Sequence, residues 1–251
     1  MRENACRTVE TEQRLRSALS EGALKLALHP VHHLAEERAW GFRVVPAMTD
    51  DTNNLVRLRQ AVPVTKENGL LALLTEFVLL QACVTITDWK DSKPLTRLSY
   101  PLGGDQFLVI DCASIVRSLS REFQIVPDAL VLEVPESAFL EEPVLAEKRA
   151  VALVSAGVGL MLYGFSGGFV SFALLEKGLF SGVVIDRHPS VTDIFSSVVE
   201  RVTQAGLMVF LESHESAARF ERNPLVYTVN TPDFPLDGST ATLPNSPGGN
   251  P

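Results

Sequence analysis

The feature that most constrains the fold is an alternation of short apolar runs with helical patterns in the second part of the chain. Five runs have the length and composition of buried strands: residues 96–102, 129–137, 158–165, 181–188 and 207–214. Strands that are apolar along their whole length are buried on both faces, as in a parallel sheet covered by helices. The alternation therefore predicts an α/β fold, with a TIM-barrel-like (β/α) barrel as the first architecture and a doubly wound open sheet as the alternative.

The first ninety residues add two helices and two strands to this pattern. Residues 10–21 read as a short polar helix with one apolar face, and residues 66–90 as a long apolar helix entered after a glycine. Between them, residues 23–34 and 39–47 resemble strands, and Pro30 suits the end of the first strand. These elements would supply the opening strands of the same domain.

The end of the chain differs in composition from the rest. Residues 238–251 are rich in Pro, Gly, Ser, Thr and Asn, and such a segment cannot bury enough apolar area to order itself. We therefore expect one barrel domain over residues 1–237 and a flexible tail over residues 238–251.

Composition and charge exclude several classes of protein. With 46% apolar residues the chain can bury a sizeable core, and a net charge of −8 without a basic run argues against nucleic-acid binding. Cys6, Cys83 and Cys112 are too few and too widely spaced for a disulfide framework or a zinc knuckle.

Residues 1–20 are polar and charged, unlike a signal peptide, and we find no apolar run that approaches a membrane span. We expect a cytoplasmic protein with no membrane partner.

Carboxylates follow several of the predicted strands, where parallel α/β folds build their sites. They are Glu133, Glu136, Asp186, Glu212 and Glu215. Acids that converge at a barrel mouth suit divalent metals and a phosphodiester substrate. They could also solvate strand ends or cap the following helices, and without further support the residues favour this interpretation over a metal site.

Two further motifs have weaker implications. The glycines of residues 160–168 match neither the dinucleotide-binding fingerprint nor the P-loop, so the spacing alone does not separate a ligand loop from a tight turn. His32 and His33 are adjacent and would point to opposite faces of any strand, which favours a polar loop rich in histidine over a metal site.

The order of these segments resembles the EAL family of cyclic di-GMP phosphodiesterase domains. Residues 24–42 look like the opening strands of that family, and 132–143 like its Leu-Glu-Ile-Thr-Glu-Ser segment. Residues 157–175 are similar to the segment that contains Asp-Asp-Phe-Gly-Thr-Gly. Residues 183–191 resemble Lys-Ile-Asp-Arg-Ser, and 205–216 resemble the Ala-Glu-Gly-Val-Glu-Thr strand. The resemblance covers almost the whole chain before the tail and implies an EAL-type (β/α) barrel.

The same resemblance implies that most metal ligands of the family are replaced here. The signature glutamate of Glu-Ala-Leu falls on Arg43, a permanent cation, and the metal-binding asparagine falls on Pro101. The two aspartates that open the loop over the active site fall on Tyr163 and Gly164. None of these four residues supplies an ionised oxygen to a hard cation.

Positions that contact nucleotide or water in the family also differ. The arginine that grips the nucleotide falls on Ala47, and the lysine near the attacking water falls on Val184. The glutamine before the family's proline falls on His29.

Three acidic positions of the family are retained. Glu133 and Glu212 match metal-ligand positions, and Glu136 matches the glutamate that braces the active-site loop. Arg43 and Asp186 are the side chains that could still contact an anionic ligand.

Taken together, the resemblance implies a barrel that keeps its scaffold and has lost the phosphodiesterase chemistry, with no cofactor. We expect a regulatory protein that binds another, unidentified protein in bacterial signalling, transcription or motility control, and that binds cyclic di-GMP weakly or not at all. The alternative is a non-catalytic cyclic di-GMP receptor with a remodelled site. Hydrolysis at a remodelled site is the least favoured of the three.

Overall fold

The computed structural model describes residues 15–19, 23–34, 39–49, 55–57, 69–90, 97–126, 128–185, 193–212, 220 and 223–229. The strands are β1 (Leu24–His33), β2 (Ala39–Thr49), β3 (Leu55–Arg57), β4 (Arg97–Pro101), β5 (Leu130–Pro135), β6 (Gly159–Tyr163), β7 (Gly182–Ile185), β8 (Met208–Leu211) and β9 (Val226–Val229). The helices are α2 (Leu70–Trp89), α3 (Gly104–Val109), α4 (Cys112–Glu122), α5 (Glu136–Glu141), α6 (Pro143–Ser155), α7 (Phe169–Leu175) and α8 (Asp193–Gln204). Residues 15–19 are also helical, within the helix predicted for 10–21.

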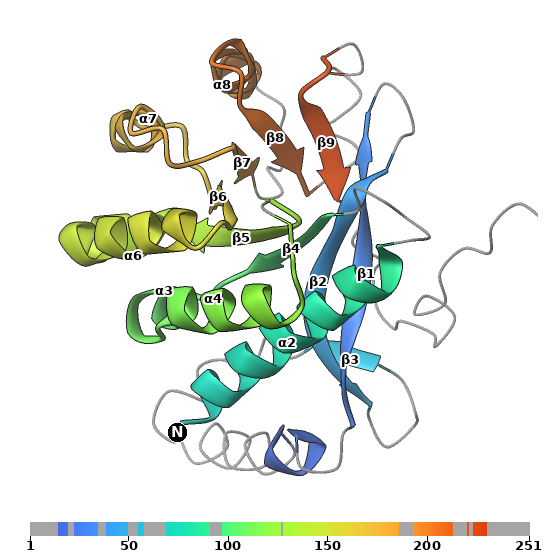
Figure 1. The fold of residues 1–251 in the computed structure, drawn as a ribbon. Coiled ribbons are helices and arrows are strands. Elements are labelled where there is room, and N and C mark those ends of the chain that lie inside the picture. The colour runs from blue at the N-terminus through green and yellow to red at the C-terminus, as the bar shows by residue number, and fades with distance from the viewer. Residues whose placement is uncertain are drawn as a thin grey trace, which may run out of the picture.

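Eight of these strands close into a barrel. The hydrogen-bonded order is β1-β9-β8-β7-β6-β5-β4-β2, and β1 pairs back with β2, while β3 adds to β2 outside the ring. Each neighbouring pair from β2 through β4 to β9 is parallel, and helices cover these strands on the outside (Figure 1). The predicted TIM-barrel-like fold is confirmed. The open-sheet alternative is wrong because the β1–β2 pairing leaves no free edge in the ring.

One strand departs from an all-parallel barrel. β1 is antiparallel to both of its neighbours, β2 and β9. The connection from His33 to Ala39 is too short for a parallel crossover, which needs a dozen or more residues. The prediction that β1 ends at Pro30 is also wrong: the strand continues to His33, and β9 pairs with it from Val31 onward. The missing N–H of the proline therefore lies outside the β1–β9 register.

Alternation along the strands separates two cores. In β5, Leu130, Leu132 and Val134 pack in the large core between strands and helices, whereas Val131 belongs to a smaller cluster inside the barrel. The interior cluster contains Val31, Trp40, Val131, Met161, Val184, Phe210 and Val229. Because side chains repeat every two residues, the next interior position of β5 is Glu133. Polar side chains thus lie above an apolar barrel floor, at the carboxyl ends of the strands.

Helix α2 corrects one expectation about membrane spans. It has 20 residues with a window of mean hydropathy 2.0, so by length and composition it could cross a membrane. In the structure it lies against the barrel, and Leu74, Val78 and Leu79 are buried in the core between helices and strands. This packing accounts for the apolar composition of the helix.

Several short elements were not predicted from the sequence. Helix α5 begins directly after β5, and helix α3 begins at Gly104, with two residues between it and the end of β4. These six-residue helices are too short to show a helical period, and the first two residues of α5, Glu136 and Ser137, had been predicted as the end of a strand. The predicted domain limit and tail (residues 238–251) fall outside the described residues and stay predictions.

Candidate functional site

Arg43 is the central side chain of the barrel mouth. It lies on β2, opposite His29 of β1 and Ser99 of β4 in the strand register. Its residue exposure is only 3%. An arginine buried this deeply requires charged or hydrogen-bonding partners, because desolvating an isolated guanidinium is costly.

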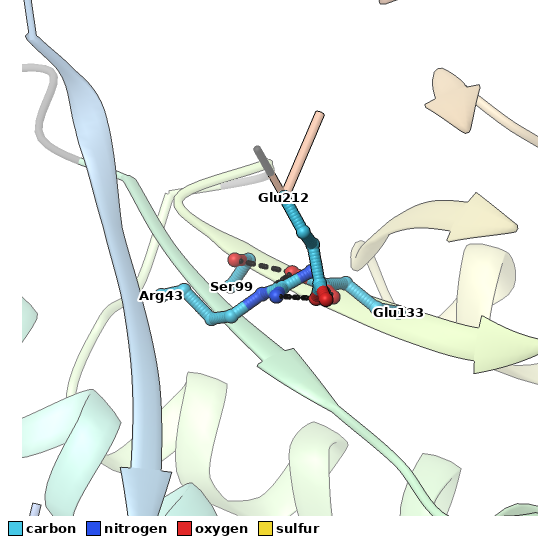
Figure 2. Close-up of polar contacts among 4 residues, drawn as sticks. All are labelled: Arg43, Ser99, Glu133 and Glu212. Atoms are coloured by element: carbon cyan, nitrogen blue, oxygen red, sulfur yellow. Dashed lines mark hydrogen bonds and ion pairs between the residues drawn. The ribbon is translucent and has the colours of Figure 1, made fainter. Parts of the chain in front are cut away.

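Two glutamates provide these partners (Figure 2). Arg43 Nε donates to Glu133 Oε1 at 2.9 Å and Nη2 donates to Glu133 Oε2 at 2.6 Å, a two-pronged ion pair. Its remaining terminal nitrogen, Nη1, donates to Glu212 Oε1. We refer to Arg43, Glu133 and Glu212 as the barrel-mouth triad. One guanidinium therefore engages both carboxylates.

Ser99 and Tyr163 complete the surroundings of the triad. Ser99 Oγ donates to Glu133 Oε1 at 2.7 Å, so this oxygen accepts from both Arg43 and Ser99. The Tyr163 ring centroid lies 5.8 Å from Arg43 Cζ, within the range of a cation–π contact.

The triad joins strands that are not neighbours. Arg43 comes from β2, Glu133 from β5 and Glu212 from the residue after β8. In the ring, β4 separates β2 from β5, and two strands lie between the other pairs. The triad therefore links three well-separated parts of the barrel wall.

Electrostatics keep the arginine charged despite its burial. Burial alone would lower the pKa of Arg43, but attraction to Glu133 and Glu212 and their hydrogen bonds outweighs it and raises the pKa above its usual value. The triad carries one fixed positive and two negative charges. Within the described ranges no group of three or more His, Cys, Asp or Glu side chains is placed to hold a metal ion.

Glu136 lies apart from the triad and contacts the loop between β6 and α7, residues 164–168. Its Oε2 accepts from the Ser166 amide at 2.7 Å, and its Oε1 accepts from Ser166 Oγ at 3.0 Å. The Ser171 hydroxyl also donates to Oε1. A single buried carboxylate thus fixes the loop to the first turn of α7.

Two glycines shape this loop. Gly164 and Gly167 have φ of 70° and 72°, a region that side chains with a Cβ rarely adopt. At Gly167 a Cβ would also lie 2.8 Å from Val198 Cγ2 of α8. The glycine-rich motif therefore makes a tight, packed turn, and its contacts come from Glu136 and α8.

The other predicted positions are distributed around the barrel. Ala47 is fully buried on β2, Pro101 ends β4 in register with Glu133, and Val184 belongs to the apolar interior cluster. His29 is buried on β1. Asp186 lies outside the described residues.

The prediction of a polar loop at the adjacent histidines is wrong, because His32 and His33 are the last two residues of strand β1. His33 is buried and its Nε2 lies 2.9 Å from the Pro224 carbonyl oxygen, whereas His32 is half-buried. They do not join the triad.

Sequence reasoning missed three hydroxyl side chains of these two networks: Ser99, Ser166 and Ser171. Ser99 could have been found, because it lies two residues before Pro101 on β4 and therefore faces the same interior. The contacts of Ser166 and Ser171 with Glu136 cross at least 30 residues of sequence, and no local pattern indicates them.

Comparison with known proteins decides the family. The profile of the EAL domain matches residues 12–212 of this chain, which include the triad and the β6–α7 loop. The chain belongs to the EAL domain family.

Curated relatives of this EAL domain are bacterial proteins. It is 26% identical over 193 residues to an uncharacterized signaling protein of Caulobacter vibrioides, a match that covers 74% of this chain and 24% of the relative. It is 28% identical over 165 residues to an uncharacterized protein of Mycobacterium tuberculosis, covering 65% of this chain and 54% of the relative. The chain thus spans between about a quarter and about half of these relatives.

Solved structures support the same fold. The PaMucR phosphodiesterase in complex with cyclic di-GMP matches with a TM-score of 0.79 at 20% identity, covering 93% of this EAL domain and 100% of that chain. The FimX EAL domain of Xanthomonas citri in complex with cyclic di-GMP matches with a TM-score of 0.77 at 18% identity, covering 91% and 94%. At these identities the likeness concerns the fold.

Proposed function

We propose that this EAL domain does not hydrolyse cyclic di-GMP and acts by binding another protein in bacterial signalling. The observation that carries the proposal is the pairing of Arg43 with both Glu133 and Glu212. The guanidinium of Arg43, a cation of the chain itself, is paired with both carboxylates at the mouth of the barrel.

Hydrolysis of a phosphodiester by a metal-dependent route needs an activated water and neutralisation of the leaving oxygen. The residues at the barrel mouth do not fit a divalent cation. Such an ion would have to displace a guanidinium that donates three hydrogen bonds to the two glutamates, and it would then lie beside a fixed positive charge.

Among the described residues, three positions where the family carries functional side chains offer no replacement ligand. Pro101 has no side-chain donor, Gly164 has no side chain, and Val184 is apolar and buried in the barrel interior. The Tyr163 ring faces the Arg43 guanidinium. A neutral phenol is a weak ligand for a hard cation compared with a carboxylate.

A second candidate is a non-catalytic cyclic di-GMP receptor. It is favoured by the two solved EAL domains above, both complexes with cyclic di-GMP. Against it, the Arg43 guanidinium that could grip a phosphate is committed to carboxylates, and Ala47 is buried and has no polar group.

The test is hydrolysis of cyclic di-GMP by the purified chain in Mg²⁺ or Mn²⁺, with PaMucR as the positive control. We expect no linear dinucleotide above a protein-free control. Metal-dependent release that is abolished by Glu133→Ala would refute the proposal.

Titration with the dinucleotide separates the interaction protein from the receptor. We expect no affinity tighter than roughly the micromolar range, about 8 kcal/mol. Saturable binding at nanomolar ligand that is lost in Arg43→Ala would favour the receptor.

A further inference from the structure

Four exposed apolar side chains lie on three helices near the barrel mouth. Val109 of α3 is 67% exposed, Leu140 of α5 59%, and Val144 and Leu145 of α6 83% and 36%. Large aliphatic side chains this exposed are ordinary when scattered, but a group of them indicates a contact surface.

These helices pack together. Helix α3 contacts both α5 and α6, and α5 contacts α6. Beneath the surface the Phe107 and Phe139 rings lie 5.7 Å apart and join α3 to α5. Asp111 Oδ1, two residues after α3, lies 3.7 Å from Arg149 Nη1 of α6. We call Val109, Leu140, Val144 and Leu145 the α3–α5–α6 surface.

Carboxylates border this surface. Glu141 and Glu142 are exposed between Leu140 and Val144, and Asp111 is exposed two residues after Val109. Hydrogen bonds from the Ser114 hydroxyl and amide lower the pKa of Asp111, so it is ionised at neutral pH. Two basic side chains of α6, Lys148 and Arg149, lie one helical turn beyond Val144 and Leu145, and Arg149 pairs with Asp111. The acids that would face a basic partner are therefore chiefly Glu141 and Glu142.

We propose that the α3–α5–α6 surface binds a basic amphipathic helix of another protein, with apolar side chains on the four aliphatic residues and Lys or Arg beside the carboxylates. The choice of occupant follows from charge: acids beside an apolar centre select a partner with basic residues around an apolar stripe. A second copy of this chain would bring a net charge of −8 and the same acids. This inference rests on the proposed function, because it names the surface through which the protein would act.

The probe is a synthetic helix of about 18 residues, roughly five turns, with leucine on one face and lysine on the other. Its partner control has the same leucines and glutamate in place of lysine. Fluorescence anisotropy with the full chain should show saturable binding of the lysine peptide, weakened at high salt, and no binding of the glutamate peptide.

Two variants locate the site. Glu141→Lys with Glu142→Lys should weaken binding of the lysine peptide about tenfold, and Val144→Asp should do the same by placing a charge at the apolar centre. Each variant has a matched control outside this surface. Glu122→Lys with Glu200→Lys changes the net charge as much as the double glutamate variant does. Val126→Asp is the control for Val144→Asp, because Val126 is also exposed, at 59%. These controls should leave binding unchanged.

Equal weakening by the controls, or binding of both peptides alike, would overturn the inference. So would self-association of the chain that Val144→Asp abolishes, because the surface would then bind a second copy. The hydrolysis assay is independent: an active enzyme that still binds the lysine peptide at this surface would refute the proposed function alone. An inactive chain that fails to bind the peptide would refute this inference alone.

Discussion

Glu133 and Glu136 lie three residues apart at the end of β5, and both are buried, but their carboxylates are paired in different ways. Glu133 faces the barrel interior and accepts from a guanidinium that is 90 residues away in sequence. Glu136 begins α5 and accepts from one amide and two hydroxyls, all neutral donors. The same residue type thus makes an ion pair across the barrel at one position and a loop anchor at the other.

The two sites differ in the free-energy cost of removing one interaction partner. A loop anchor that loses its carboxylate leaves neutral donors without a partner, at a modest free-energy cost. A buried ion pair that loses its cation leaves charge without compensation, which costs considerably more. The comparison therefore predicts an order of effects on the free energy of unfolding.

The largest effect is expected for Arg43→Met. It leaves the buried Glu133 carboxylate and the partly buried Glu212 carboxylate together without their cation, so we expect the free energy of unfolding to fall by about 3–5 kcal/mol. Urea unfolding measures this change. The matched triple variant with Glu133→Gln and Glu212→Gln removes the charges as well and should recover most of the loss. Equal instability of the single and triple variants would show that packing, and not charge, explains the effect.

Glu136→Ala should have a smaller effect of about 1–3 kcal/mol, because it leaves the Ser166 amide and the Ser171 hydroxyl without their acceptor. Glu136→Gln keeps one acceptor oxygen and should lose less. Urea unfolding of both variants tests this order. A loss as large as that of Arg43→Met would remove the distinction between ion pair and anchor.

Within the loop, Gly167→Ala should destabilise the protein by about 1–2 kcal/mol through its positive φ alone, with an added cost from the Val198 side chain 2.8 Å from the new Cβ. Gly164→Ala is the control, since its φ is also positive but no atom lies within 4 Å of its Cβ. Thermal unfolding should show a greater loss at Gly167. The reverse order would contradict the packing of this loop against α8.

The effect that is smallest at neutral pH, and grows only at alkaline pH, concerns two buried thiols. Burial raises the pKa of Cys83 to about 11 and that of Cys112 to about 12. In the unfolded chain thiols titrate near about 8.5, so above that pH the unfolded state loses protons first and stability falls as pH rises toward the folded-state values. Unfolding at several alkaline pH values should show a shallower decline in Cys83→Ala with Cys112→Ala. An unchanged slope would contradict the burial of these thiols.

The sequence predicted much of this molecule where the signal is periodic. Near-continuous apolar strands, such as residues 130–134 with Glu133 as their one polar residue, are typical of a parallel sheet covered by helices, so this arrangement was predictable from the sequence. Closure through an antiparallel β1 did not follow, because pairing between β1 and β9 joins distant segments. The ion pair of Arg43 was also beyond reach: the resemblance placed a cation near Glu133 and Glu212, but the direction of its side chain depends on the barrel radius and strand stagger. Ser99 was within reach of the sequence, because the two-residue period of β4 places it on the same face as Pro101.

The most direct test of the central claim, that Arg43 takes the place of a divalent cation at the barrel mouth, is a Mn²⁺ titration of the wild-type chain by calorimetry. We expect no saturable binding up to about 1 mM, which corresponds to about 4 kcal/mol. Binding should appear in Arg43→Ala and disappear again when Glu133→Gln is added. Saturable Mn²⁺ binding by the wild-type chain that is lost in Glu133→Gln would show that the two glutamates still hold a metal ion despite Arg43.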